Sequence, residues 1–178
     1  DNVSGRLVDL NSVFDSFQIE VNSSNKDSTD ELALANSRAR LRMTTLYYFA
    51  GINNYLVVGT GNKVEDFGVG FYTKYGDGGV DLSPIADLLK SQVFNLGKFL
   101  KVDDTIINAK PSDGLYADSR SDEDQIGATY DELEWAMKAR ESNSKISDRE
   151  KDVLKIYRSF NTKNKHKMEP IPVCKIPK

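Results

Sequence analysis

Apolar residues between positions 32 and 50 recur at intervals of three and four, which places them on one face of a predicted helix. Ser28 and Glu31 have the spacing of a capping box at the start of this helix. Gly51 is typical of a residue that ends a helix in the left-handed conformation. The predicted apolar face consists of Leu32, Ala35, Ala39, Met43, Leu46 and Ala50.

Three further helices are predicted downstream. Ser83-Pro84 is a helix-start signal, and apolar residues then continue at helical spacing from Leu88 to Leu100. Helical patterns also cover residues 130–140 and 147–160. The last of these begins with a second capping box, Ser147 with Glu150.

Three short segments are predicted as strands. Residues 5–17 begin with alternating apolar and polar positions, which predicts a strand followed by a turn. The continuously apolar run 55–58 predicts a buried parallel strand, and residues 105–107 predict another. Strands separated by helices favour an α/β fold, here a single domain over residues 1–178 with a three-layer, Rossmann-like parallel sheet and flanking helices. Three strands are few for such a sheet and the sequence does not begin with Met, so we expect its first strands upstream of Asp1.

Composition narrows the class of protein. The chain holds 24 Lys and Arg against 27 Asp and Glu, with one histidine and one cysteine. A single cysteine excludes an internal disulfide framework, and a single histidine excludes a multi-histidine zinc site. No apolar run approaches the roughly 20 residues that cross a bilayer, and no signal-peptide pattern is present. We therefore expect a cytoplasmic protein with no membrane partner.

Positive charge is concentrated at the C-terminal end. Residues 151–178 carry eight Lys or Arg and two acidic residues, whereas residues 1–150 are strongly acidic. The sequence shows no basic stripe with a recognition helix, so a nucleic-acid partner is not predicted. The basic tail, residues 161–178, is interpreted as a solvated segment or as a surface for an anionic ligand or an acidic partner.

Glycine is dense between residues 68 and 79, and the run Asp77-Gly78-Gly79 predicts a tight turn with positive φ. Beside it, Lys74 can meet an anion, and Asp81 can accept hydrogen bonds from hydroxyl or amide groups. Thr60 follows the predicted strand 55–58, at the strand end that borders the ligand crevice in parallel sheets. The two segments together predict a binding site.

Seven segments occur in a specific order: Asn36–Met43, Gly59–Glu65, Phe71–Asp81, Asp122-Glu123, Gly127, Tyr130-Asp131 and His166-Lys167. Together they resemble NAD synthetase, the ammonia-dependent ligase, over nearly the whole chain. The resemblance implies that ATP adenylates the nicotinate carboxylate of deamido-NAD and releases pyrophosphate. Ammonia then displaces AMP to give NAD. ATP and Mg²⁺ as cofactors, and a homodimer with deamido-NAD at the subunit interface, are implied as well.

The resemblance also implies roles for individual residues. Glu65 matches a magnesium ligand, and its hard carboxylate oxygens suit that ion. The positions that match ATP contacts are Thr60, Lys90 and Ser112. The positions that match deamido-NAD contacts are Arg40, Lys74, Asp81, His166 and Lys167, several of which reach across the dimer interface in the family. No catalytic residue is assigned.

One motif of the family is missing. The Ser-Gly-Gly-x-Asp-Ser loop, which holds pyrophosphate at a helix N-terminus and supplies a second magnesium ligand, does not occur in this sequence. Either the chain is the later part of a longer enzyme, or it is a catalytically silent, dimeric relative that binds a dinucleotide. Another ligase of the ATP-pyrophosphatase superfamily is a further alternative, against which residues 73–81 argue because they match the deamido-NAD site.

Overall fold

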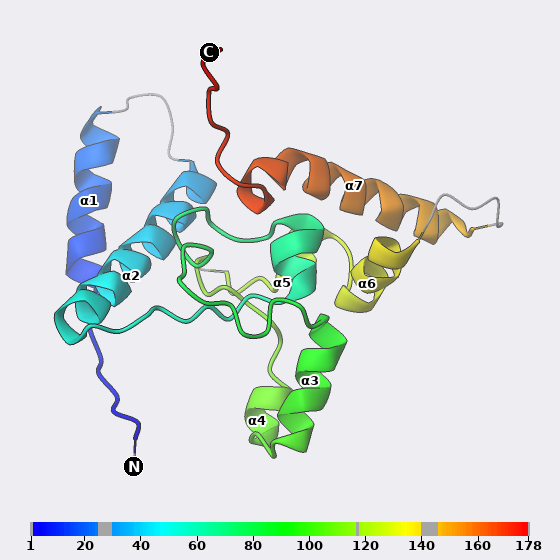
Figure 1. Ribbon diagram of the computed structural model, residues 1–178, viewed down its shortest axis with the longest axis horizontal. Helices are drawn as coiled ribbons and strands as arrows, with labels where there is room; N and C mark the ends of the chain where they lie inside the picture. Colours follow the sequence, from blue (N-terminus) through cyan, green and yellow to red (C-terminus); the bar gives the residue numbers. More distant parts are fainter. Residues whose placement is uncertain (1, 25–29, 117, 140–145, 178) are drawn as a thin grey trace.

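The computed structural model describes residues 2–24, 30–116, 118–139 and 146–177. Its regular elements are α1 (Asn11–Ser24), α2 (Glu31–Asn53), the π-helix η1 (Val64–Val69), α3 (Lys90–Phe99), α4 (Asp104–Ile107), α5 (Asp122–Ile126), α6 (Tyr130–Lys138) and α7 (Asp148–Met168). Figure 1 shows α1 beside α2 on one side of the molecule, α6 and α7 on the other, and α3 together with α4. Long irregular segments connect these groups through the centre.

The long predicted helix is present as α2. Asp30 caps its start, because Oδ1 accepts from the N–H groups of Leu32 and Ala33 at 2.9 and 3.1 Å. Ser28, the predicted cap, lies outside the described residues. The predicted apolar face is buried at Ala35, Ala39, Met43 and Ala50, and exposed at Leu32 and Leu46.

The predicted end of this helix at Gly51 is wrong. The helix continues to Asn53, and the left-handed residue is Asn54, with φ 54°. The N–H of Asn54 donates to the carbonyl of Ala50, which satisfies part of the helix end. Asparagine tolerates this conformation better than most residues, so a glycine is not required there.

The main hydrophobic core forms where α6 and α7 pack against η1. Val64, Val69 and Leu133 are wholly buried in it. Both predicted helices are confirmed, although α6 ends at Lys138, where Ala139 is extended, and Arg140 lies outside the described residues. The capping box of Ser147 with Glu150 is present, and α7 extends to Met168, so residues 161–168 are helical.

A row of side chains on α7 completes the hydrogen bonding at the end of η1. Nδ2 of Asn161 and Nδ2 of Asn164 donate to the carbonyls of residues 68 and 69, at 2.7 and 2.8 Å. Lys167 Nζ donates to the next carbonyl, that of Gly70, at 2.8 Å. Gly70 has φ 62°, and a Cβ there would lie 2.5 Å from the Cβ of Asn164. The close approach of α7 to η1 therefore requires glycine at this position.

The predicted parallel sheet is wrong for the part of the chain that the structure describes, which contains no β-strand. Within the run 55–58 only Val57 is buried. Val58 forms an isolated parallel bridge with Leu82, and the N–H of Gly59 donates to the carbonyl of Leu82 at 2.7 Å. With one partner and a single bridge, this segment has the beginning of parallel pairing without a ladder.

Two other strand predictions are also wrong. In the segment 5–17, residues 5–10 are irregular and the rest belongs to α1, where Asp9 Oδ1 accepts the Asn11 N–H at 2.9 Å at the start of the helix. Residues 105–107 belong to the single turn α4, which Asp103 caps by accepting the N–H of Thr105 at 2.8 Å. In both places a local aspartate cap favours a helix over the short apolar pattern.

Two local predictions between α2 and α3 are also corrected. Helix α3 begins at Lys90 rather than at Ser83-Pro84, which lies in a turn region. The residues of the glycine-dense segment with left-handed backbone are Gly70 and Tyr75, with φ 62° and 68°, and the predicted positive φ at residues 77–79 is wrong.

Candidate functional site

Glu65 stands near the start of η1 and accepts hydrogen bonds on both carboxylate oxygens. Oε1 accepts from Lys90 Nζ at 2.9 Å and from Tyr130 Oη at 2.6 Å. Oε2 accepts from the N–H of Asn62 at 3.3 Å. The side chains of Glu65 and Lys90 are 15% and 18% exposed, so this ion pair is shielded from water. The structure thus joins the predicted metal ligand Glu65 and the predicted ATP contact Lys90.

Asp122 extends this cluster into the interior. Its Oδ2 lies 3.2 Å from Tyr130 Oη, whereas its Oδ1 is buried without a hydrogen-bond partner among the described residues. Tyr130 has one hydroxyl hydrogen, which its shorter contact assigns to Glu65. Burial, together with the nearby charge of Glu65, raises the pKa of Asp122 and raises that of Tyr130 far above its usual range. The cluster therefore sets two carboxyl groups against one ammonium group.

This donor set fits Mg²⁺. The ion is usually held by one or two carboxylates, with water and substrate phosphates completing the octahedron. Glu65 and Asp122 supply hard oxygen donors, the buried Oδ1 of Asp122 lacks a partner, and the excess negative charge favours a cation. In the described ranges no group of three or more His, Cys, Asp or Glu side chains could hold a metal. Phosphate oxygens of a nucleotide would therefore have to complete the coordination.

Ser112, a predicted ATP contact, is connected to this cluster through the backbone only. Its Oγ accepts the N–H of Gly114 at 3.2 Å and donates to the carbonyl of Arg120 at 3.3 Å. The loop that it begins is closed by the N–H of Asp122, which donates to the carbonyl of Pro111 at 3.0 Å. Ser112 and Asp122 therefore lie at the two ends of one closed loop.

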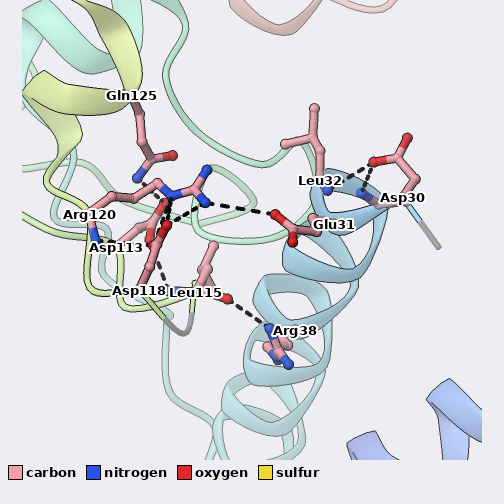
Figure 2. A network of polar contacts seen from close by, with 10 residues as sticks. Asp30, Glu31, Leu32, Arg38, Asp113, Leu115, Asp118, Arg120 and Gln125 are labelled. Atoms are coloured by element: carbon pink, nitrogen blue, oxygen red, sulfur yellow. Dashed lines mark hydrogen bonds and ion pairs between the residues drawn. The ribbon is translucent and has the colours of Figure 1, made fainter.

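The same loop is held against α2. Arg38 Nη1 donates to the carbonyl of Leu115 at 2.7 Å, and Arg42 donates to the carbonyls of residues 113 and 114 at 3.4 and 3.3 Å. Figure 2 shows Arg38 reaching from α2 to the loop, and Arg120 reaching from the loop towards Glu31 at the start of α2. These arginines thus position the loop that carries Ser112.

Four of the predicted deamido-NAD contacts meet at the bend formed by residues 73–81. Arg40 Nε donates to the carbonyl of Lys74 at 3.2 Å, and Lys74 Nζ donates to the carbonyl of His166 at 2.8 Å. Lys167 Nζ donates to two carbonyls just before the bend, at 2.8 and 2.7 Å. Residues from α2, the bend and the end of α7 are therefore brought together within one chain.

A pocket of about 200 Å³ opens beside this bend, and its walls include Asp66, Tyr72, Asp77, Gly78, Lys167 and Met168. Burial, with a further contribution from the charges of Glu65 and Asp77, raises the pKa of Asp66 to about 6. Burial also raises the pKa of Tyr72 to about 12 and lowers the pKa of Lys167. With carboxyl and ammonium groups on its walls, the pocket can bind cationic and anionic parts of a ligand.

The remaining two predicted contacts, Thr60 and Asp81, lie next to wall residues of this pocket in the sequence. Thr60 is exposed and stands between two glycines that line the pocket. Asp81 is engaged elsewhere: Oδ1 accepts from the Tyr47 hydroxyl at 3.0 Å, and Oδ2 accepts from the Val57 N–H at 2.8 Å. Asp81 therefore ties α2 to the segment 55–58, which sequence reasoning did not predict.

Sequence reasoning gave no role to three residues that the structure places in the site. Asp122 and Tyr130 belong to segments that resemble the family, but nothing in their spacing shows that both approach Glu65. Asp66 directly follows Glu65, and an acidic residue there cannot be distinguished from a surface charge by pattern alone. Only the structure shows that Asp66 lies on the π-helix η1 and lines the pocket.

Comparison with known proteins identifies the family of this chain. The NAD synthase family model matches residues 2–171. The NH(3)-dependent NAD(+) synthetase of Carboxydothermus hydrogenoformans is 38% identical over 147 residues, which are 83% of this chain and 60% of the relative. That of Finegoldia magna is 44% identical over 141 residues, which are 79% of this chain and 56% of the relative. The structure of NMN synthetase from Francisella tularensis matches with a TM-score of 0.84 at 31% identity, over 98% of this chain and 68% of that chain.

These matches define the fold of an NAD synthetase, a ligase. The chain belongs to the NAD synthase family, which confirms the resemblance. It spans 60% and 56% of the lengths of the two curated relatives named above. No helix in the described ranges is long and apolar enough to cross a membrane.

Proposed function

We propose that this chain carries the acceptor-binding part and the Glu65 metal site of an ammonia-dependent NAD synthetase. The reaction is the ATP-dependent amidation of deamido-NAD by ammonia, through an adenylated intermediate, to give NAD, AMP and pyrophosphate. One observation supports this proposal above the others. Two adjacent residues of η1 belong to the proposed metal site and to the pocket. Glu65 accepts hydrogen bonds from Lys90 and Tyr130, while Asp66 lines the pocket beside the bend.

The chemistry of the first step is electrostatic, because a weak carboxylate nucleophile attacks a crowded polyphosphate. Bound Mg²⁺ would neutralise part of the phosphate charge. Glu65, with Asp122 behind Tyr130, would hold the ion, and Lys90 would turn its ammonium group from Glu65 to a phosphate oxygen. Thr60 and Ser112 would add hydroxyl contacts to ATP.

The bend would hold the acceptor. Lys74 and Arg40 present cations to the two phosphates of deamido-NAD, while Lys167 and His166 close the site from the end of α7. In the second step ammonia attacks the acyl carbon, AMP leaves, and the attacking nitrogen loses a proton. Asp66 lines the pocket beside the bend, and its carboxylate would take up that proton.

Nicotinate mononucleotide is a second candidate acceptor. The structure with a TM-score of 0.84 is an NMN synthetase, whereas the curated relatives named above are NAD synthetases. Both acceptors present the same nicotinate carboxylate and differ in the adenylate half. The number of cations around the bend favours the dinucleotide, because deamido-NAD carries a second phosphate for Lys74 and Arg40 to bind.

The proposal also covers how the protein assembles and whether this chain is active alone. We expect a cytoplasmic homodimer in which the basic end of α7 also approaches the neighbouring subunit's acceptor. The Ser-Gly-Gly-x-Asp-Ser loop is absent from this sequence, so a silent dinucleotide-binding chain and a different ATP-pyrophosphatase-type ligase are the alternatives that an experiment must separate.

Calorimetry on this chain with deamido-NAD, nicotinate mononucleotide and ATP·Mg²⁺ tests the proposal. We expect binding of deamido-NAD in preference to the mononucleotide. NAD formation is then measured by mass spectrometry after addition of ATP, Mg²⁺ and ammonium. NAD formation by this chain would exclude the silent relative. Binding without product fits both a silent relative and the later part of a longer enzyme, because the Ser-Gly-Gly-x-Asp-Ser loop is absent from this sequence. An absence of preference for deamido-NAD contradicts the proposed substrate.

A further inference from the structure

The two carboxylate oxygens of Glu65 are used unequally. Oε1 receives two side-chain donors, at 2.9 Å from Lys90 and at 2.6 Å from Tyr130. Oε2 receives a single backbone N–H at 3.3 Å, at the long end of the hydrogen-bond range. Oε2 therefore keeps lone pairs for a cation, and the donors on Oε1 decide where Oε2 points.

Of these two donors, Tyr130 is fixed before any ligand arrives. It is 6% exposed, belongs to the main core, and is the first residue of α6. Its N–H donates to Glu123 Oε1 at 2.9 Å, and the capping box of Thr129 and Glu132 holds the start of the helix. The position of the Tyr130 hydroxyl is thus set by the core rather than by the metal cluster.

Asp122 lies on the other side of the Tyr130 hydroxyl. Its Oδ2 lies 3.2 Å from Tyr130 Oη, and the residue is 8% exposed at the first position of α5. Ser121 and Asp124 form a capping box around it, so the backbone of Asp122 is ordered by its own helix start. The hydroxyl of Tyr130 is therefore bracketed by Glu65 and Asp122.

Lys90 cannot perform the same task once a cation is bound. Its ammonium would be repelled by a divalent cation on the same carboxylate, whereas the neutral hydroxyl of Tyr130 is compatible with a positive charge on Oε2. We propose that Tyr130 is the positioning residue that orients Glu65 for a divalent cation. This rests on the proposed function, because it concerns the metal site of that reaction.

The test measures Mn²⁺ affinity of this chain in the presence of ATP, from the free Mn²⁺ signal in electron paramagnetic resonance. Tyr130→Phe keeps the ring and removes the hydroxyl. Loss of a residue that orients a metal ligand costs 10- to 100-fold in affinity, so the dissociation constant should rise at least about 10-fold. Tyr157→Phe is the matched control, because Tyr157 packs against the same core and its hydroxyl has no partner among the described residues. Its affinity should equal that of the unmodified chain.

The outcomes separate this proposal from the proposed function. If Glu65→Gln lowers Mn²⁺ affinity while Tyr130→Phe does not, the positioning role is overturned and the metal site stands. If the unmodified chain and Glu65→Gln bind Mn²⁺ alike, the metal assignment at Glu65 fails and the positioning role fails with it. Should circular dichroism show that Tyr130→Phe is unfolded, Tyr130→Met is measured instead, because methionine also lacks the hydroxyl and fills irregular core space. Its dissociation constant for Mn²⁺ should rise by the same factor, and an unchanged affinity overturns the proposal.

Discussion

Replacing Lys167 with Met separates the structural role of this side chain from its proposed contact with substrate. Lys167 Nζ donates to the carbonyls of Gly70 and Tyr72 at 2.8 and 2.7 Å, which ties the end of α7 to the segment that follows η1. Methionine keeps most of the aliphatic stem and the helix propensity but removes the ammonium group. Both carbonyls then lose their side-chain donor.

The expected loss follows from these two hydrogen bonds. Each hydrogen bond to a charged donor contributes about 1.5–3 kcal/mol. Burial lowers the pKa of Lys167, so the ammonium has already lost part of its hydration, which offsets some of this gain. Water can also reach carbonyls that are only partly buried. We expect a net decrease of about 2 kcal/mol in the free energy of unfolding.

Urea denaturation, followed by far-ultraviolet circular dichroism and by the fluorescence of Trp135, measures this change. Lys165→Met is the matched control, because Lys165 is 64% exposed and pairs only with Glu169 at 3.3 Å. The control should change stability by less than about 0.5 kcal/mol. The reasoning is refuted if both substitutions lower the free energy of unfolding equally. If Lys167→Met leaves stability intact and abolishes deamido-NAD binding, Lys167 serves the ligand alone.

Three further substitutions test other parts of the site. Lys74→Ala should weaken deamido-NAD binding in calorimetry far more than ATP binding, with Lys98→Ala on α3 as the control, and equal losses for both ligands would contradict its role. Glu65→Gln should raise the Mg²⁺ concentration needed for ATP binding, and an unchanged metal titration would count against the metal assignment. The Arg149 guanidinium holds the pKa of Glu132 at about 2, so its stabilisation is present above about pH 4.5 and is lost as the pH falls towards 2. Glu132→Gln should therefore cost about 1 kcal/mol at pH 7 and clearly less at pH 3 in urea denaturation, and an equal loss at both would disprove the coupling.

Helices were predictable from the sequence where local signals agree. The capping box of Ser147 with Glu150 and the helical spacing after it gave α7, and the structure confirms both. Short apolar runs were not decided by local signals. An apolar run as short as residues 105–107 is compatible with a strand or with a helical turn. In the structure it forms a helical turn, which the Asp103 side chain caps.

The site was predictable only through the family resemblance. Glu65 and Lys90 are 25 positions apart, and no periodic pattern indicates that their side chains meet at 2.9 Å. Tyr130 is a larger omission, because a tyrosine at a helix start is usually interpreted as core packing. It packs in the core and also places its hydroxyl 2.6 Å from Glu65, so one residue serves both purposes.

The π-helix explains why the basic end of the chain could not be understood from charge alone. A π-helix is rare and occurs mostly as a single turn, frequently at functional sites. α7 supports η1, since Asn161, Asn164 and Lys167 donate to three successive carbonyls at its end. η1 carries Glu65 of the proposed metal site and Asp66 of the pocket. By holding the end of η1, this face of α7 therefore helps to position both the metal site and the pocket. Lys167, to which the resemblance assigns a contact with deamido-NAD, is therefore also the last of the three α7 donors that hold the end of η1 in position.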